Sequence, residues 1–122
     1  MINLKQLYKS FSHAIHGVKT VFKQEQSFRI QTIAGLLAVI LSFYFKITQF
    51  EFLLVILMIG FVMSLELINS VIERLIDSQK PRIHPVVKEI KDIMAATVLF
   101  ASLLALIIGV VIFYPHFRDL LV

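Results

Sequence analysis

The sequence predicts an all-α membrane protein in which an amphipathic surface helix precedes three transmembrane helices. Hydrophobic residues make up 58% of the 122 residues and charged residues only 16%, which is more apolar material than a soluble domain of this length could bury. The apolar residues gather in three long blocks, and the residues before the first block follow a helical amphipathic pattern instead. We expect a single domain over residues 1–122, and the absence of Cys excludes disulfides and thiolate metal sites.

Residues 4–25 form the expected surface helix. Their large apolar side chains recur every three or four positions and therefore share one face: Leu4, Leu7, Tyr8, Phe11, Ile15, Val18 and Phe22. The remaining positions carry polar side chains: Lys5, Lys9, Ser12, His16, Lys19 and Lys23. Such a helix lies in the headgroup layer, where its aromatic residues anchor it and anionic lipids attract it. Packing against the transmembrane bundle is an alternative that is compatible with this position.

The three apolar blocks predict transmembrane helices at residues 29–48, 50–77 and 91–115. The charge-free part of the first block, residues 30–45, covers about 24 Å at ~1.5 Å per residue, a little less than a ~30 Å hydrocarbon core. The second block is free of charge over residues 52–65, and its helical pattern then continues past Glu66. The third is uninterrupted over residues 93–115 and is the clearest span.

The basic residues predict the orientation. Ten of the twelve Lys and Arg residues lie before the first span or between the second and third, and only Lys46 and Arg118 lie on the other side. Because cytoplasmic segments carry the excess of positive charge, we expect the N-terminus and the second loop in the cytoplasm and the C-terminus outside.

A stripe of polar residues interrupts the second span. Glu66, Asn69, Ser70, Glu73 and Asp77 fall on one face of a helix and extend over about 16 Å, from the apolar zone towards the cytoplasmic interface. An acidic side chain at the centre of a membrane helix costs at least ~2.5–3.5 kcal/mol on insertion scales. The cost falls near the interface, so Glu66 is the costly residue, and a functional polar site is the interpretation we favour.

Two further segments reach the same depth as this stripe. Glu25 ends the surface helix, and Lys91-Asp92 opens the third span. The carboxylates of Glu25 and Glu73 would suit Mg²⁺, which takes one or two carboxylates together with substrate phosphate oxygens, and Lys91 would suit a phosphate. The alternative for these charges is ordinary local pairing: Glu73 or Asp77 with Arg74 or Lys80, Lys88 with Asp92, and Glu25 with Arg29.

Other sites are excluded by the residues. The sequence has no GxxxxGK[ST] or GxGxxG motif and no HExxH, and its four glycines are widely scattered. Nucleic acid is not an expected partner, because the membrane topology already explains the basic charge.

Several motifs in order resemble the small bacterial membrane kinase family that contains the prokaryotic diacylglycerol kinases and the undecaprenol kinases. They are ELINSVIE at residues 66–73 followed by Asp77, His84-Pro85, KDIMAATVL at residues 91–99, FSHAIHG at residues 11–17 and EQSFR at residues 25–29. The resemblance covers roughly residues 10–105. One departure is Ala96-Thr97, where relatives commonly have Gly and Ala, and both residues remain small enough for close helix packing.

The resemblance implies a homotrimer with sites between subunits that transfers the γ-phosphate of ATP, with Mg²⁺, to a lipid hydroxyl. Glu66 would be the general base, and Glu25 and Glu73 would bind Mg²⁺ next to the nucleotide. The remaining nucleotide-binding residues would be Asn69, Asp77, His84, Lys91 and Asp92. The lipid substrate would contact Phe11, Ala14, Gly17 and Ser70.

The acceptor lipid stays open at this point. The His84-Pro85 loop, the absence of Trp and the segment before Glu25 resemble the undecaprenol kinases more, and Gln6 stands where diacylglycerol kinases would place a basic lipid contact. Undecaprenol is therefore the expected acceptor and diacylglycerol the alternative. A non-enzymatic holin-like or scaffold membrane protein would share the size and topology, but it would have no need of Glu66 and Asn69 on one face.

Overall fold

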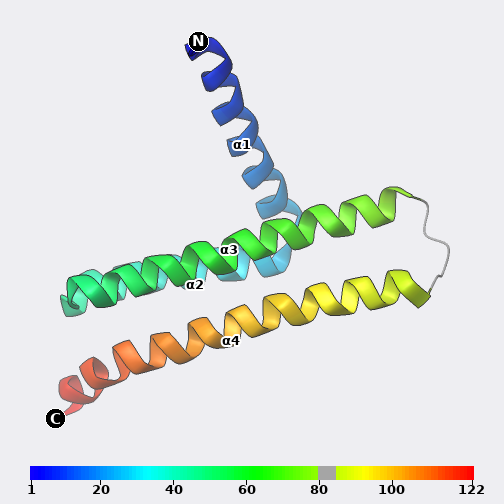
Figure 1. Cartoon of the computed structure of the whole chain (residues 1–122). Coiled ribbons are helices and arrows are strands. Elements are labelled where there is room, and N and C mark those ends of the chain that lie inside the picture. The colour runs from blue at the N-terminus through cyan, green and yellow to red at the C-terminus, as the bar shows by residue number, and fades with distance from the viewer. Residues whose placement is uncertain (80–84) are drawn as a thin grey trace.

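The computed structural model of the chain describes residues 1–79 and 85–122, and every regular element in these ranges is an α-helix. The helices are α1 (Leu4–Gln24), α2 (Gln26–Phe45), α3 (Gln49–Ser78) and α4 (Pro85–Leu121). The last three are long and apolar enough to cross a membrane. They run side by side, while α1 projects steeply away from them (Figure 1). The predicted class, a surface helix followed by three membrane helices, is confirmed.

Each of the three long helices begins before the segment that hydropathy indicated, and α2 also ends earlier, at Phe45 rather than at residue 48. The second begins at Gln26 rather than at residue 29, and the fourth occupies Pro85–Leu121 rather than residues 91–115. Apolar blocks mark only the part of a helix that suits hydrocarbon, whereas hydrogen bonding continues into the polar flanks. Pro85 suits a first helical position, because no intrahelical partner is required of its nitrogen there.

The chain bends between α1 and α2 at Glu25, which has an extended conformation (φ −120°, ψ 118°). The Glu25 N–H donates to the Val21 carbonyl at 2.8 Å. Arg29 Nη1 donates to the carbonyls of Phe22 and Lys23 at 2.9 and 2.8 Å. The two Arg29 bonds satisfy carbonyls that the end of α1 leaves without helical partners. They hold the surface helix at an angle to the bundle.

A short turn joins α2 to α3. Lys46 adopts the left-handed conformation (φ 51°) and ends α2. Thr48 and Glu51 then form a capping box: Thr48 Oγ1 accepts from the Glu51 N–H at 3.1 Å, and Glu51 Oε1 accepts from the Thr48 N–H at 3.0 Å. The sequence ITQFE therefore begins α3 with backbone N–H groups that have hydrogen-bond acceptors.

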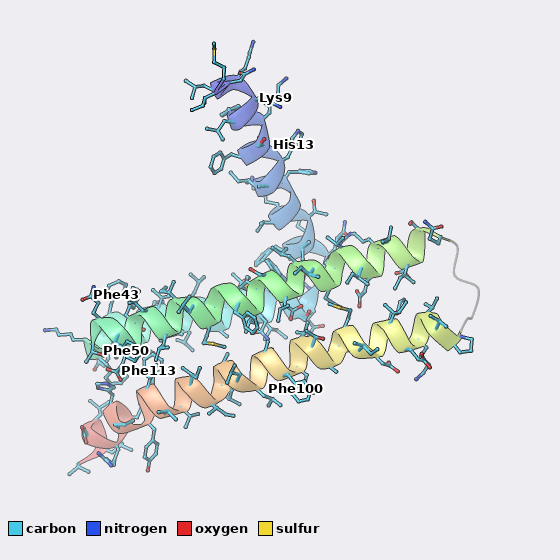
Figure 2. The ribbon with its side chains drawn as sticks, viewed as in Figure 1. Lys9, His13, Phe43, Phe50, Phe100 and Phe113 are labelled. Carbon is cyan, nitrogen blue, oxygen red and sulfur yellow. The ribbon has the colours of Figure 1, made fainter. Side chains whose placement is uncertain are left out.

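Helix α3 lies at the centre of the fold, since it packs on both α2 and α4 and also contacts α1. Val55, Ile112 and Phe113 form the buried core near the turn. Figure 2 shows Phe113 at this end of the bundle with Phe43 and Phe50, whereas Lys9 and His13 lie along the projecting α1. Most other large apolar side chains of the spans are exposed in the single chain, as expected of helices that face lipid or further helices.

Candidate functional site

The polar stripe of α3 passes from a buried end to an exposed end. Glu66 is 2% exposed and Ser70 is 1% exposed, and they are the most buried polar residues of this helix. Asn69 Oδ1 is buried and has no hydrogen-bond partner among the described residues. Glu73 is half-buried and Asp77 is exposed. The stripe therefore begins at buried residues inside the bundle and ends at an exposed residue.

Glu66 receives a hydrogen bond from another helix. Ser27 Oγ, in the first turn of α2, donates to Glu66 Oε2 at 3.1 Å. Glu66 Oε1 accepts no hydrogen bond from the part of the chain that the structure describes. The carboxylates of Glu25 and Glu73 lie close enough to Glu66 to repel a negative charge on its carboxyl group. One oxygen of this buried side chain is therefore held, and the other has no donor among residues 1–79 and 85–122.

Glu25 lies at the bend between α1 and α2 and is contacted from α3. Ser70 Oγ donates to Glu25 Oε1 at 2.6 Å, and Arg74 Nη1 lies 3.4 Å from the same oxygen. Arg74 also donates to Ser70 Oγ and, through Nη2, to Gln24 Oε1 at 2.5 Å. Arg74 therefore pairs with Glu25, and not with Glu73 or Asp77 as local pairing would have it. Arg29 binds carbonyls of α1, so the alternative Glu25–Arg29 pair is also not formed.

The described residues contain no cluster of three His, Asp or Glu side chains that could hold a metal ion. Glu25 and Glu73 together offer two carboxylates near Glu66. Two carboxylates fit Mg²⁺, because this ion usually completes its coordination with water and substrate phosphate oxygens. The donor set thus fits a metal that binds together with a nucleotide better than a metal that the protein encloses alone.

Lys91 lies towards the exposed end of the stripe. Lys91 Nζ donates to Asp77 Oδ1 at 2.9 Å, and Glu73 also attracts its charge. Asp77 is about 16 Å along α3 from Glu66 at ~1.5 Å per residue. Within one chain, Lys91 therefore does not offset the burial of Glu66; Ser27 is the group that contacts it. Asp92 forms the expected pair with Lys88 at 3.0 Å, and His84 lies outside the described residues.

The four residues expected to contact lipid fall into two groups. Phe11, Ala14 and Gly17 lie on α1 and are exposed, and a side chain added at Gly17 would meet nothing within 4 Å. Ser70 is buried and bonded to Glu25. Its hydroxyl is engaged with the carboxylate cluster, so in the single chain it does not lie on the surface that α1 offers to lipid.

Three contact residues of this site were not anticipated from the sequence: Ser27, Arg74 and Gln24. Ser27 lies only two residues after Glu25, but nothing in its immediate surroundings predicts a contact with a residue on another helix. For Arg74 the sequence suggested only, as an alternative, a local pair with Glu73 or Asp77 on its own helix. Periodicity can group residues within a helix, but it does not show which residues of separate helices meet.

The fold and the site define a small polytopic membrane protein with a cluster of carboxylates where the start of α2 meets α3. The model of the family described as prokaryotic diacylglycerol kinase matches residues 12–113. The chain is 33% identical over 112 residues to the undecaprenol kinase of Bacillus subtilis, covering 92% of this chain and 91% of that one. It is 30% identical to the diacylglycerol kinase of Haemophilus influenzae (91% and 95% covered) and 28% identical to that of Escherichia coli K12 (92% and 92% covered). The chain belongs to the prokaryotic diacylglycerol kinase family and is a membrane lipid kinase.

Proposed function

We propose that this lipid kinase transfers the γ-phosphate of ATP to the hydroxyl group of undecaprenol, with Glu66 as the general base. One observation carries the assignment of the base. Glu66 is buried in the bundle, one of its oxygens is fixed by Ser27 and the other accepts no bond from the described residues. The undecaprenol kinase among its relatives supports the acceptor.

The proposed reaction needs positioning and charge neutralisation more than covalent catalysis. Glu66 Oε1 takes the proton of the lipid hydroxyl as the lipid oxygen forms a bond to the γ-phosphorus. The bond between that phosphorus and the β–γ bridging oxygen breaks, and ADP leaves with the electron pair. Mg²⁺, held by Glu25 and Glu73, would neutralise charge on the phosphates. The products are the phosphorylated lipid and ADP. The proton of the lipid hydroxyl remains on Glu66.

The remaining polar residues are assigned to the nucleotide. Asn69 is half-buried, its Oδ1 is buried without a partner among the described residues, and its amide could donate to a phosphate. Lys91 would contact phosphate as a cation, while Asp77, Asp92 and His84 would contact the nucleotide further towards water. The exposed end of the stripe supports this arrangement, because ATP arrives from the aqueous side.

An apolar groove supports an acceptor with a long hydrocarbon tail. A cavity of about 650 Å³ lies between α2, α3 and α4, and nearly all its lining side chains are apolar. It includes Val62, one helical turn from Glu66, and Gln31, which donates to Ser102 Oγ at 3.0 Å. A tail in this groove would leave the lipid hydroxyl at the level of Glu66. Diacylglycerol is the second candidate acceptor, and the Haemophilus influenzae relative supports it.

Assembly and sidedness belong to the same proposal. A homotrimer would place the sites between subunits, which suits a chain too small to enclose both ATP and a lipid alone. With the basic segments in the bacterial cytoplasm, α1 and the site face the compartment that contains ATP, and the C-terminus lies outside.

The proposal is tested with the purified chain in lipid bilayers, labelled ATP and Mg²⁺, with undecaprenol and diacylglycerol offered together. We expect labelled undecaprenyl phosphate as the main product. Glu66→Gln should abolish nearly all transfer while membrane insertion persists, and an active Glu66→Gln variant would refute the base assignment. Phosphorylation of diacylglycerol alone would reverse the choice of acceptor.

The metal assignment needs its own test. Glu73→Ala should raise the Mg²⁺ concentration required for half-maximal activity, because one of the two carboxylates is lost. Glu51→Ala is a matched control at the far end of the same helix, where the carboxylate serves the capping box. An unchanged Mg²⁺ titration for Glu73→Ala would count against its role as a ligand.

A further inference from the structure

Ser27 occupies an unusual position for a helical serine. Hydroxyl groups within these helices ordinarily donate to the carbonyl four residues earlier: Thr20 to His16 at 2.9 Å, Thr32 to Phe28 at 2.8 Å and Ser42 to Ala38 at 2.7 Å. A serine that does so is occupied within its own helix and cannot donate elsewhere.

The bend at Glu25 removes this option for Ser27. The residue four positions earlier is Lys23, which belongs to α1, and the Lys23 carbonyl already accepts a hydrogen bond from Arg29 at 2.8 Å. The extended conformation of Glu25 separates the two helices between these positions. The Ser27 hydroxyl instead points across to α3 and donates to Glu66 Oε2 at 3.1 Å.

The two residues of this bond differ in accessibility. Ser27 is exposed in the chain, whereas Glu66 is 2% exposed. A buried carboxylate that must present one oxygen to a substrate hydroxyl needs the other oxygen held in place, since it would otherwise rotate among several rotamers. A hydrogen bond to a charged acceptor is strong enough to select one of them.

We propose that Ser27 is a positioning residue of the kinase reaction, which holds Glu66 Oε2 so that Oε1 faces the lipid hydroxyl. This role rests on the proposed function of Glu66 as the base. The helix break at Glu25 thereby has two effects: it places Glu25 beside α3, and it releases the serine that orients the base.

The test compares Ser27→Ala with Ser27→Thr in lipid phosphorylation by the full chain. The alanine variant should lower kcat about tenfold, in line with the loss of a hydrogen bond to a charged group, while KM for ATP and for the lipid changes less than about twofold. The threonine variant keeps the hydroxyl, and its extra methyl group has room at an exposed position, so kcat should stay within about twofold of the parent. Ser42→Ala, on the same helix, should leave the kinetics unchanged, because its hydroxyl bonds only within α2.

Three results would overturn the role of Ser27. They are an unchanged kcat in Ser27→Ala, a Ser27→Thr variant as slow as the alanine variant, and a loss that appears only in KM. Thermal unfolding of each variant in the same detergent should match the parent, and a lowered transition in Ser27→Ala alone would assign the bond to stability instead.

A double variant separates this inference from the proposed function. In a Glu66→Asp background, the shorter side chain no longer reaches Ser27, so adding Ser27→Ala should cause less than a twofold further loss. A further tenfold loss would show that Ser27 acts on something other than Glu66. If Glu66→Gln were fully active, the base assignment would fall by itself, whatever the Ser27 variants show.

Discussion

Ser70 Oγ donates to Glu25 Oε1 at 2.6 Å, from the turn of α3 that follows Glu66. Ser27, two residues after Glu25, donates in the opposite direction to Glu66 Oε2. Two serine–glutamate bonds thus join the start of α2 to α3. A serine of α2 holds the glutamate of α3, and a serine of α3 holds the glutamate that precedes α2. The orientation of both acidic groups therefore depends on how these two segments pack together.

The Ser70–Glu25 bond predicts an effect on metal use. Ser70→Ala removes a donor that fixes the Glu25 carboxylate, so the Mg²⁺ that we propose for this site would have to order the side chain on binding. We expect the Mg²⁺ concentration for half-maximal activity to rise about three- to tenfold, with kcat at saturating Mg²⁺ nearly restored. A Mg²⁺ titration at fixed ATP measures both quantities.

The control for Ser70→Ala is Ser64→Ala, which changes an exposed serine of the same helix. Its Mg²⁺ titration should coincide with that of the parent. If Ser70→Ala also coincided with the parent, the bond would have no part in metal binding, and Ser70 would remain a candidate lipid contact.

Arg74 links α3 to the last residue of the surface helix. Its guanidinium donates to Gln24 at 2.5 Å and lies 3.4 Å from Glu25, and its side chain is 42% exposed. Ion pairs of this exposure contribute only about 0–1 kcal/mol to stability. Arg74→Ala should therefore change the thermal transition little, but it should loosen the end of α1, seen as faster hydrogen exchange of backbone amides in residues 18–25.

Arg74→Lys is the matched variant for this prediction, since an ammonium group keeps the charge but cannot bond Gln24 and Ser70 as a guanidinium fork does. We expect intermediate exchange rates. Equal rates in the parent and in Arg74→Ala would show that Arg29 alone holds the bend through the carbonyls of Phe22 and Lys23.

The sequence was sufficient to predict the four helices and the polar face of α3, because both depend on local periodicity. The greater exposure of Asp77 compared with Glu66 and Ser70 agrees with its position nearer the end of the apolar block. The amphipathic pattern of residues 4–25 likewise predicted that α1 would not be one of the membrane-spanning helices, and α1 projects away from them.

Contacts between helices could not be predicted in this way. Glu25 is not a residue that ordinarily breaks a helix, so the sequence placed the end of the surface helix near it but did not show that the break would release Ser27. The sequence suggested Lys91 as a phosphate contact at the level of the polar stripe, but it did not show that the register of α4 against α3 would bring Lys91 to Asp77. That register depends on the packing of the whole interface and is not encoded in any single motif.

The Lys91–Asp77 pair allows a functional role to be separated from a structural one. Both side chains are substantially exposed, at 40% and 56%, so the pair adds little to stability. Lys91→Ala should raise KM for ATP about tenfold or more while the thermal transition stays within a few degrees of the parent. Lys88→Ala, which breaks the neighbouring exposed pair with Asp92, is the control and should leave KM for ATP nearly unchanged. A KM for ATP that did not change in Lys91→Ala would remove this residue from the nucleotide site.

Substitutions at Gly35 test whether the site depends on the close packing of α2 against α3. Gly35 is buried in α2, and a Cβ atom added there would lie 3.2 Å from Ile59 Cγ2 on α3, closer than ordinary van der Waals contact. A larger side chain must push α2 away from α3, which strains or breaks the Ser27–Glu66 and Ser70–Glu25 bonds at the other end of the same interface. Overpacking of this kind typically costs about 1–3 kcal/mol.

We therefore expect Gly35→Leu to lower both the thermal transition in detergent and kcat, whereas Gly35→Ala should show a small effect because the flexible Ile59 side chain can move by a few tenths of an ångström. Gly60→Leu is the matched control, since an added side chain at Gly60 meets nothing within 4 Å of its own chain. A Gly35→Leu variant with full activity would mean that the serine–glutamate bonds do not depend on this contact. A loss of stability at Gly60 as well would be explained by a second copy that packs against that face of α3 in the proposed homotrimer.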